Sequence, residues 1–129
     1  MIYRLRLVPS RHYEYISPSV KEVLGYTPEE CYADPDLIFR AVHPDFRRQV
    51  ETARKGKGPF DQYQELCAFH KGGRLVWLER LHIPIYDDAG ILVAIEGISR
   101  DISKRKESEK ALKKSTVRAI GVVWGRSDF

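Results

Sequence analysis

The alternation of apolar and polar residues predicts five β-strands, with a block of short helices between the second and the third. The first two strands lie at residues 3–8 and 13–16, and the short link between them makes a hairpin. The other three lie at residues 60–70, 74–86 and 91–102, separated by turns rich in glycine. The last strand begins with a β-branched apolar run, which is typical of a strand buried on both faces.

The stretch between the second and third strands contains four helix-start signals. In three of them a capping residue precedes proline, at Ser17, Thr27 and Asp34, and Glu30 completes a capping box with Thr27. The fourth is His43, again before proline. Because each helix is short, none is expected to be stable unless it packs against the sheet. Two strands, four helices and three strands imply an α+β fold with an antiparallel sheet.

Size and charge are those of one soluble domain. The 129 residues are 43% hydrophobic and 31% charged. No apolar run approaches the roughly 20 residues that span a bilayer, and no signal peptide is evident, so we expect a cytoplasmic protein without a membrane segment. The net charge of +4 is concentrated in residues 104–114, which hold six basic and two acidic residues. The rest of the chain is balanced, which argues against nucleic-acid binding as the main function.

The chain divides into three segments. Residues 1–103 form the predicted domain. Residues 104–115 form a polar helix that is either solvated or the start of a coiled coil that needs a partner. Residues 116–129 contain strand-like apolar residues interrupted by glycines, and no structure is assigned to them.

Six motifs, in the right order, resemble those of a PAS domain. They are YISPSV (15–20), GYTPEE (25–30), VHPD (42–45), GRLVWLE (73–79), PIYD (84–87) and GISRDIS (97–103). The first three resemble the N-terminal part of a PAS domain and the last three its C-terminal PAC part. The resemblance covers about residues 2–112. It implies a five-stranded antiparallel sheet in the order 2-1-5-4-3, with short helices on one face and a C-terminal helix.

PAS domains are sensor and interaction modules, common in bacterial histidine kinases and in proteins of cyclic di-GMP signalling. The resemblance therefore implies the sensor part of a two-component histidine kinase, or of a related signalling protein, with a kinase or cyclase domain downstream. The chain has no phospho-acceptor histidine box followed by a nucleotide-binding lobe. It also has no Ser-His-Asp order, glycine-rich phosphate loop or metal-ligand spacing, so no enzymatic activity is expected.

Strand pairing predicts which side chains face the pocket of such a domain. A four-residue turn at residues 87–90 would pair Tyr86 with Ile91. The same register pairs His82 with Ile95, Arg80 with Gly97 and Leu78 with Ser99. One face carries these six residues, and the other carries Trp77, Glu79, Leu81, Ile83, Ala94 and Ile98. By resemblance the first face is directed towards the helices and the pocket, whereas hydrophobicity alone would favour the second as the core.

The ligand-binding residues that the resemblance implies come from the helices and from three strands. They are Phe39, Val42, Val50, Leu66, Ala68, Leu78, Arg80, His82, Ile95, Gly97 and Ser99. Arg80 and His82 in a pocket would suit a small anionic ligand, because charge-assisted hydrogen bonds to a carboxylate are strong. The alternative is that the twist of the strand carries both side chains to solvent at its edge.

The sequence names no cofactor and no metal site. Haem is not expected, because His43 precedes the helix that carries the haem ligand in PAS haem proteins; capping and packing are its simpler role. An acid–base pair of His43 with Asp45 has no supporting motif. Flavin–cysteinyl photochemistry is not expected, because residues 33–37, where its cysteine would lie, contain none. Cys31 and Cys67 are more plausible as buried free thiols than as a disulfide.

The end of the last strand is the predicted link to an output. Gly97 and Ser99 would sense whether the pocket is occupied. Asp101 and Ser103 would cap and orient the following helix, and Ile102 would dock it against the sheet. Binding of a ligand or a partner would then shift the population of two helix arrangements.

A different class of function is a ligand-free dimerisation module. It predicts a filled core and an apolar dimer face built from Trp77, Leu81, Ile83 and Ile98. The C-terminal helix or a second subunit should cover this outer face of the sheet, and we expect a homodimer.

Overall fold

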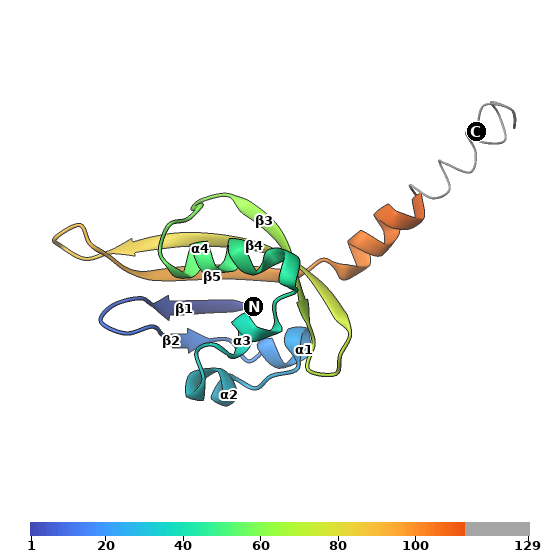
Figure 1. The fold of residues 1–129 in the computed structure, drawn as a ribbon, viewed down its shortest axis with the longest axis horizontal. Coiled ribbons are helices and arrows are strands. Elements are labelled where there is room, and N and C mark those ends of the chain that lie inside the picture. Colours follow the sequence, from blue (N-terminus) through green and yellow to red (C-terminus); the bar gives the residue numbers. More distant parts are fainter. Residues whose placement is uncertain (113–129) are drawn as a thin grey trace, which may run out of the picture.

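The computed structural model describes residues 1–112, which form one sheet, a set of short helices and a projecting C-terminal helix (Figure 1). The strands are β1 (Ile2–Arg6), β2 (His12–Ile16), β3 (Tyr63–Phe69), β4 (Leu75–Tyr86) and β5 (Leu92–Asp101). The helices are α1 (Val20–Leu24), α2 (Pro28–Ala33), α3 (Leu37–Ala41), the 3-10 helix η1 (Pro44–Phe46) and α4 (Arg47–Arg54). Residues 103–112 are helical and lead away from the sheet.

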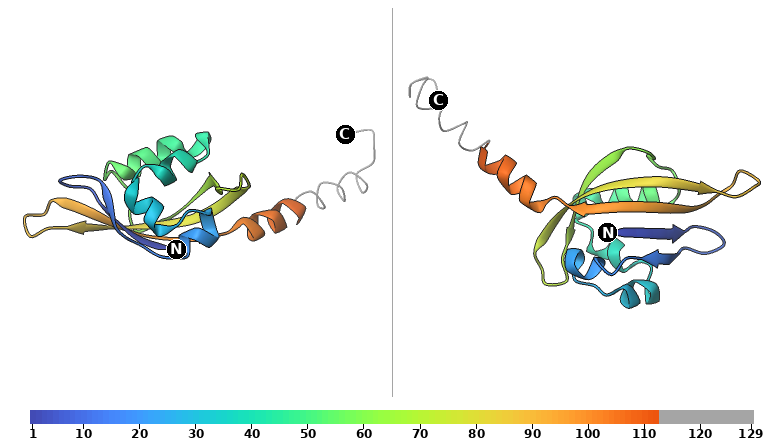
Figure 2. Two further views of the ribbon diagram at one scale, coloured as in Figure 1. Left: turned by 90° about the horizontal axis from the view of Figure 1, so that it is seen from below. Right: turned by 180° about the vertical axis from the view of Figure 1, so that it is seen from behind.

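The five strands form one antiparallel sheet in the order β2-β1-β5-β4-β3, with β5 in the centre. The predicted α+β fold and strand order are therefore confirmed. The short helices lie on one side of the sheet (Figure 2). Val93, Ala94 and Ile95 of β5 are all buried, although consecutive residues of a strand point to opposite faces. Burial on both faces requires neighbours on both sides, which explains the central position of β5.

The helices begin where local capping and contacts with the core agree. Thr27 and Glu30 form the predicted capping box of α2: Glu30 N donates to Thr27 Oγ1 over 3.1 Å, and Thr27 N donates to Glu30 Oε1 over 3.0 Å. Val20 and Leu24 place one side of α1 in the core, where both are completely buried beside Ile16 of β2. The short helices thus depend on the sheet for stability.

Two of the predicted helix starts are wrong by two residues. The N-cap of α1 is Ser19 and not Ser17, and the N-cap of α3 is Asp36 and not Asp34. The Ser17 hydroxyl accepts a hydrogen bond from Ile2 N over 2.9 Å, which ties the end of the hairpin to β1. Asp34 Oδ1 accepts from Asp36 N over 3.1 Å and forms the turn before α3. In both places the side chain that was expected to cap the helix accepts a hydrogen bond from another backbone amide, in β1 for Ser17 and in the preceding turn for Asp34.

The predicted register between β4 and β5 is wrong by two residues. The structure pairs Arg80 with Ser99, His82 with Gly97 and Pro84 with Ile95. Half of the difference arises in the turn, where Asp87 N donates to Ile91 O over 2.9 Å and leaves only residues 88–90 in the loop. Asp87 Oδ1 tightens this turn by accepting hydrogen bonds from Ala89 N and Ile91 N, over 2.9 and 3.0 Å.

The other half of the difference is a β-bulge in β5. Tyr86 pairs with Leu92, but Ile85 pairs with Ala94, so Val93 is an extra residue on that strand. A shift of one residue would exchange the two faces of a strand. The shorter turn and the bulge each add one such shift, and together they restore the predicted faces.

Further expectations concern the cysteines, metals and membranes. Cys31 and Cys67 are buried free thiols, and burial raises the pKa of each to about 11. Within residues 1–112, no cluster of three or more histidine, cysteine, aspartate or glutamate side chains is arranged to hold a metal ion. No helix in that part of the chain has the length and apolar character needed to cross a bilayer.

The predicted segment boundaries are only partly covered by the structure. The C-terminal helix begins at Ser103, one residue before the predicted 104–115. Its predicted last residues, and the tail at 116–129, lie outside the described residues.

Candidate functional site

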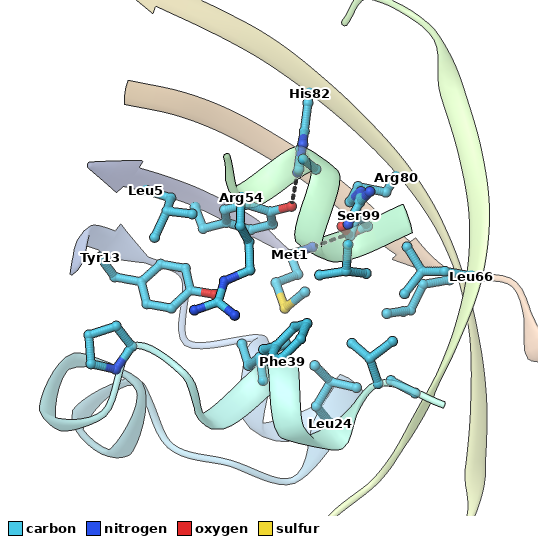
Figure 3. Close-up of a pocket in the computed structure, with 18 residues that line it drawn as sticks. Met1, Leu5, Tyr13, Leu24, Phe39, Arg54, Leu66, Arg80, His82 and Ser99 are labelled. Carbon is cyan, nitrogen blue, oxygen red and sulfur yellow. Dashed lines mark hydrogen bonds between the residues drawn. The ribbon is translucent and has the colours of Figure 1, made fainter. Parts of the chain in front are cut away.

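A cavity lies between the inner face of the sheet and the helices (Figure 3). Its volume is about 60 Å³. A water molecule needs about 10–15 Å³ in this measure, so the cavity holds about four waters or one small molecule. It is much too small for a flavin or a haem in this conformation.

Most of the predicted ligand-binding residues lie around this cavity. They are Phe39, Val42, Val50, Leu66, Ala68, Leu78, Arg80, His82 and Ser99. Ile95 and Gly97 were predicted as well but do not line it. Ile95 is completely buried in the packing of the central strand, and Gly97 is covered by the ring of Tyr3. A ligand-binding role for the nine residues stays a prediction.

Sequence reasoning missed several of the side chains that line the cavity. Tyr3 and Leu5 come from β1, Tyr13 from β2 and Arg54 from α4. The signal for β1 was present, because Tyr3 and Leu5 share one face of a strand that the predicted order places beside β5. The position of Arg54 depends on how α4 packs, which no local pattern encodes.

Tyr3 and His82 form a buried polar pair above Gly97. The Tyr3 hydroxyl lies 2.5 Å from His82 Nε2, and the two rings meet edge to face with centroids 5.7 Å apart. Burial, with a smaller contribution from the nearby Arg80 charge, lowers the pKa of His82 to about 3. Burial also raises the pKa of Tyr3. Both side chains are therefore neutral at physiological pH.

Arg80 lies beside this pair and is a charged group on the sheet side of the cavity, as is the Met1 ammonium, which donates to the Ser99 carbonyl oxygen over 2.8 Å (Figure 3). Arg80 and His82 are each 7% exposed, so the alternative that strand twist carries them to solvent is wrong. The hydrogen bond of the Arg80 guanidinium is a long one, in which Nη2 donates to Gln64 Oε1 over 3.3 Å. Burial lowers the pKa of Arg80 from its ordinary value.

The root of the C-terminal helix is built from the three residues that follow the cavity wall. Asp101 Oδ1 accepts a hydrogen bond from Ser103 N over 2.8 Å. Ser103 Oγ accepts from Trp77 N over 2.9 Å, and Ile102 N donates to Trp77 O over 2.8 Å. Ile102 is buried, and its carbonyl accepts the first hydrogen bond of the helix, from Lys106 N. The helix therefore starts from a fixed position on β4.

A match to a protein-family model shows the family to which the chain belongs. Residues 13–99 match a model described as the PAS fold. The chain belongs to the PAS family. The match begins in β2 and ends at Ser99 in the cavity wall, so β1 and the helix root of this PAS domain lie outside it.

Relatives of this PAS domain occur in several kinds of protein. The chain is 25% identical over 117 residues to the methyl sulfide methyltransferase-associated sensor of Methanosarcina acetivorans, which covers 87% of the chain but only 11% of that protein's length. The N-terminal domain of a diguanylate cyclase with PAS/PAC sensor from Marinobacter aquaeolei has a TM-score of 0.68 at 22% identity, covering 81% of this chain and 96% of that one. A sensory box histidine kinase/response regulator from Burkholderia thailandensis has a TM-score of 0.66 at 24% identity, covering 92% and 88%. At these identities the two structures show the shared fold.

Ion pairs surround the helix root of the PAS domain. Lys106 Nζ lies 2.7 Å from a Glu65 carboxylate oxygen and 5.0 Å from the centre of the Trp77 ring. Arg105 and Arg100 both pair with Glu79, over 3.2 and 2.8 Å. These pairs are partly exposed and individually weak. Together they bind the first turn of the helix to the outer face of β3 and β4.

The ion pair between Glu65 and Lys106 predicts that the stability of the protein depends on pH. The hydrogen bond from Lys106 holds the pKa of Glu65 below its usual value of 4.5. A carboxylate with a lowered pKa in the folded state contributes stability above its unfolded pKa, and this contribution is lost as the pH falls through the folded value. We therefore expect Glu65→Gln to be slightly less stable than the parent at pH 7, with the difference disappearing below pH 4.5.

Urea unfolding at several pH values measures this difference. Glu107→Gln is the control, because Glu107 is an exposed glutamate on the C-terminal helix, next to Lys106, without an ion pair among the described residues. A Glu65→Gln difference that is constant from pH 7 to pH 3 would contradict the assignment.

The outer face of the sheet is only partly covered. Trp77 packs edge to face against Phe46 and beneath Lys106. Leu81 and Ile83 are half-buried. The exposed apolar side chains beside them are Ile98 (44% exposed), Ile2 (54%) and Tyr63 (63%). The four predicted dimer-face residues are thus not equivalent, since Trp77 already has partners within the chain.

His43 and the two cysteines lie away from the cavity. His43 Nδ1 accepts a hydrogen bond from Asp45 N over 3.1 Å at the start of η1, which is a capping role. Its ring packs beside Phe46 and Phe69. Neither His43 nor Cys31 or Cys67 lines the cavity.

Proposed function

We propose that this PAS domain is a sensory input module in which the state of the cavity is passed along β5 to the C-terminal helix. The observation that carries the proposal is that the neighbouring strands β4 and β5 each contribute residues both to the cavity wall and to the root of the C-terminal helix. In β5, Ser99 lines the cavity and Asp101 receives the first amide of the helix. In β4, Leu78 lines the cavity and Trp77 holds Ser103 and Ile102. A small movement of either strand therefore moves the helix root.

We expect the domain to lie in the cytoplasm, within a longer signalling protein. Relatives include a sensor, a histidine kinase/response regulator and a diguanylate cyclase with a PAS/PAC sensor. We propose that the chain is the sensor part of a two-component histidine kinase or a related protein, and that phosphorelay or cyclase chemistry belongs to a downstream domain. Asp101, Ile102 and Ser103 are the proposed coupling residues, and the chain itself is proposed to be non-catalytic.

Replacing Asp101 with alanine is the direct test of the coupling. Asp101 is exposed, and its contribution is the hydrogen bond to Ser103 N. We expect a loss of about 1 kcal/mol or less in the free energy of unfolding, as for other capping residues. Amide exchange within residues 103–112 should become faster while exchange in the sheet is unchanged. A large loss of stability of the whole domain would contradict this role for Asp101.

A change inside the cavity should reach the helix in the parent and not in the Asp101→Ala variant. Ala68→Val adds two methyl groups to the cavity wall, and amide exchange in residues 103–112 reports the response. Cys31→Ala is the matched control, because Cys31 is completely buried but lies outside the cavity. An equal response to both substitutions would mean that the helix senses general stability and not the cavity.

The alternative function is a ligand-free dimerisation module. The exposed Ile2, Ile98 and Tyr63 on the outer face favour it, because apolar groups gathered on one face usually mark an interface. Native mass spectrometry separates the two functions: a monomer or dimer with a bound small molecule supports the sensor, and a dimer without one supports the dimerisation module.

A further inference from the structure

Within the described part of the chain, Arg80 is a buried cation without a buried anion. It is 7% exposed, and within residues 1–112 no aspartate or glutamate forms an ion pair with it. Its recorded hydrogen bond, to the neutral side chain of Gln64, uses one of five guanidinium N–H groups. Buried charges in proteins are normally paired, because desolvation of an unpaired charge is costly. The site is thus electrostatically incomplete.

The other polar groups around the cavity do not supply the missing charge. His82 is neutral, and the hydroxyls of Tyr3 and Tyr13 remain protonated because burial raises the pKa of both. Arg54 is another cation in the wall, but it pairs with Asp36 and, over 3.6 Å, with Glu51. The Met1 ammonium also lines the cavity, and it donates to the Ser99 carbonyl oxygen over 2.8 Å. Among residues 1–112 the Arg80 guanidinium therefore faces the cavity without an anionic partner, and a negative charge in the cavity would balance it.

The shape and chemistry of the cavity restrict what could carry that charge. A volume of about 60 Å³ admits a molecule of about four non-hydrogen atoms, judged by the space that the same number of waters needs. The guanidinium and the Ser99 hydroxyl lie at the sheet side, whereas Leu24 and Phe39 form an apolar wall on the helix side (Figure 3). A planar oxyanion fits a guanidinium, and a short alkyl end fits the apolar wall.

We propose that the cavity binds a small aliphatic monocarboxylate of the size of acetate, with its carboxylate at Arg80 and its alkyl end towards Leu24 and Phe39. This inference rests on the proposed function, because it takes the cavity to be the input of the sensor. A neutral molecule would leave Arg80 unpaired.

Nuclear magnetic resonance titration of the full chain tests the proposal. Sodium acetate should give saturable shifts at the amides of Leu78, Arg80 and Ser99. Acetamide, which has the same size without the charge, should give none. Sodium gluconate maintains the ionic strength, and its anion is too large for the cavity. Equal binding of acetamide, or equal saturation by chloride, would overturn the proposal.

Arg80→Met should weaken acetate binding by at least about tenfold, because it removes charge-assisted hydrogen bonds. Arg48→Met is the matched control: Arg48 is exposed on α4, and its removal should leave the affinity unchanged. Unchanged binding in Arg80→Met would overturn the assignment. Far-UV circular dichroism verifies that the variant is folded.

A second variant tests the proposal even if Arg80→Met does not fold. Ala68→Val keeps the charge but narrows the cavity, so the affinity for propionate should fall more than that for formate. An unchanged size preference would place the ligand outside the cavity and overturn the proposal. The proposal would also be overturned if formate, acetate and propionate all failed to give saturable binding to the parent protein.

The outcomes also separate this inference from the proposed function. If acetate binds but amide exchange in residues 103–112 is unaffected, the ligand assignment stands and the coupling fails. If Ala68→Val changes that exchange but no monocarboxylate binds, the coupling stands and the ligand assignment fails.

Discussion

Replacing Gly97 with alanine is expected to lower the free energy of unfolding by about 2–3 kcal/mol, at the upper end of the usual range for overpacking. A methyl group at this position would lie 2.1 Å from Tyr3 Cζ and 2.5 Å from its hydroxyl oxygen. The ring of Tyr3 cannot stay where it is, and its 2.5 Å contact with His82 would be lost with it. Urea unfolding followed by circular dichroism measures the change.

The cause can be isolated with a double-mutant cycle. Tyr3→Ala is itself destabilising because it leaves a cavity, but it removes the group with which the new methyl would clash. In the Tyr3→Ala background, Gly97→Ala should therefore cost less than about 0.5 kcal/mol. Gly72→Ala serves as the control, because its methyl group would lie 3.3 Å from the side chain of His70 in a surface turn. An equal cost of Gly97→Ala in both backgrounds would refute the steric explanation.

The sequence indicates that some group lies close to Gly97, but it does not identify that group. A glycine inside an apolar strand indicates a close approach of some other group. From the sequence, that group could be another backbone or a ligand, and Gly97 was placed among the ligand-binding residues. The group is Tyr3 of β1, which pairs with Gly97 directly. The partner lies in a strand 94 positions earlier in the sequence, and local patterns do not encode the register of that pairing.

The inner face of β4 could be predicted although its register was not. Periodicity of two residues places Leu78, Arg80 and His82 on one face whatever their partners are. The turn at Asp87 and the bulge at Val93 each moved the pairing by one residue, so the error was even and the faces of β5 were preserved. With only one of the two shifts, Ser99 would have been predicted on the wrong side. The predicted faces were therefore correct only because the two shifts of one residue add up to an even number.

The size and the electrostatic character of the cavity lay beyond the sequence. The volume of about 60 Å³ results from how Tyr3, Phe39 and the helices fill the space above the sheet. The compensation of Arg54 depends in part on its pair with Asp36 at the start of α3, and so on the packing of α4 against α3. Only with these positions known does Arg80 become the unpaired charge.

Replacing Ile102 with alanine is expected to cost about 3 kcal/mol and to release the C-terminal helix from the sheet. Ile102 is 5% exposed, and truncation of a buried isoleucine removes its apolar contacts and leaves a cavity. Its backbone joins the two parts, because its N–H donates to Trp77 O and its carbonyl accepts from Lys106 N. Loss of the side chain therefore weakens the domain and the helix root together.

Two measurements distinguish anchoring from general destabilisation. Ile98→Ala removes the same atoms from β5 at a position that is 44% exposed, so it should cost only about 1 kcal/mol. The fluorescence of Trp77, measured in a Trp124→Phe background, should shift to longer wavelength in Ile102→Ala but not in Ile98→Ala, because Lys106 covers the ring only while the helix root is docked. Equal costs for the two substitutions, with the Trp77 emission unchanged in both, would mean that the ion pairs of Lys106 and Arg105 hold the helix without Ile102. The path from β5 to the output would then run through the outer face of the sheet.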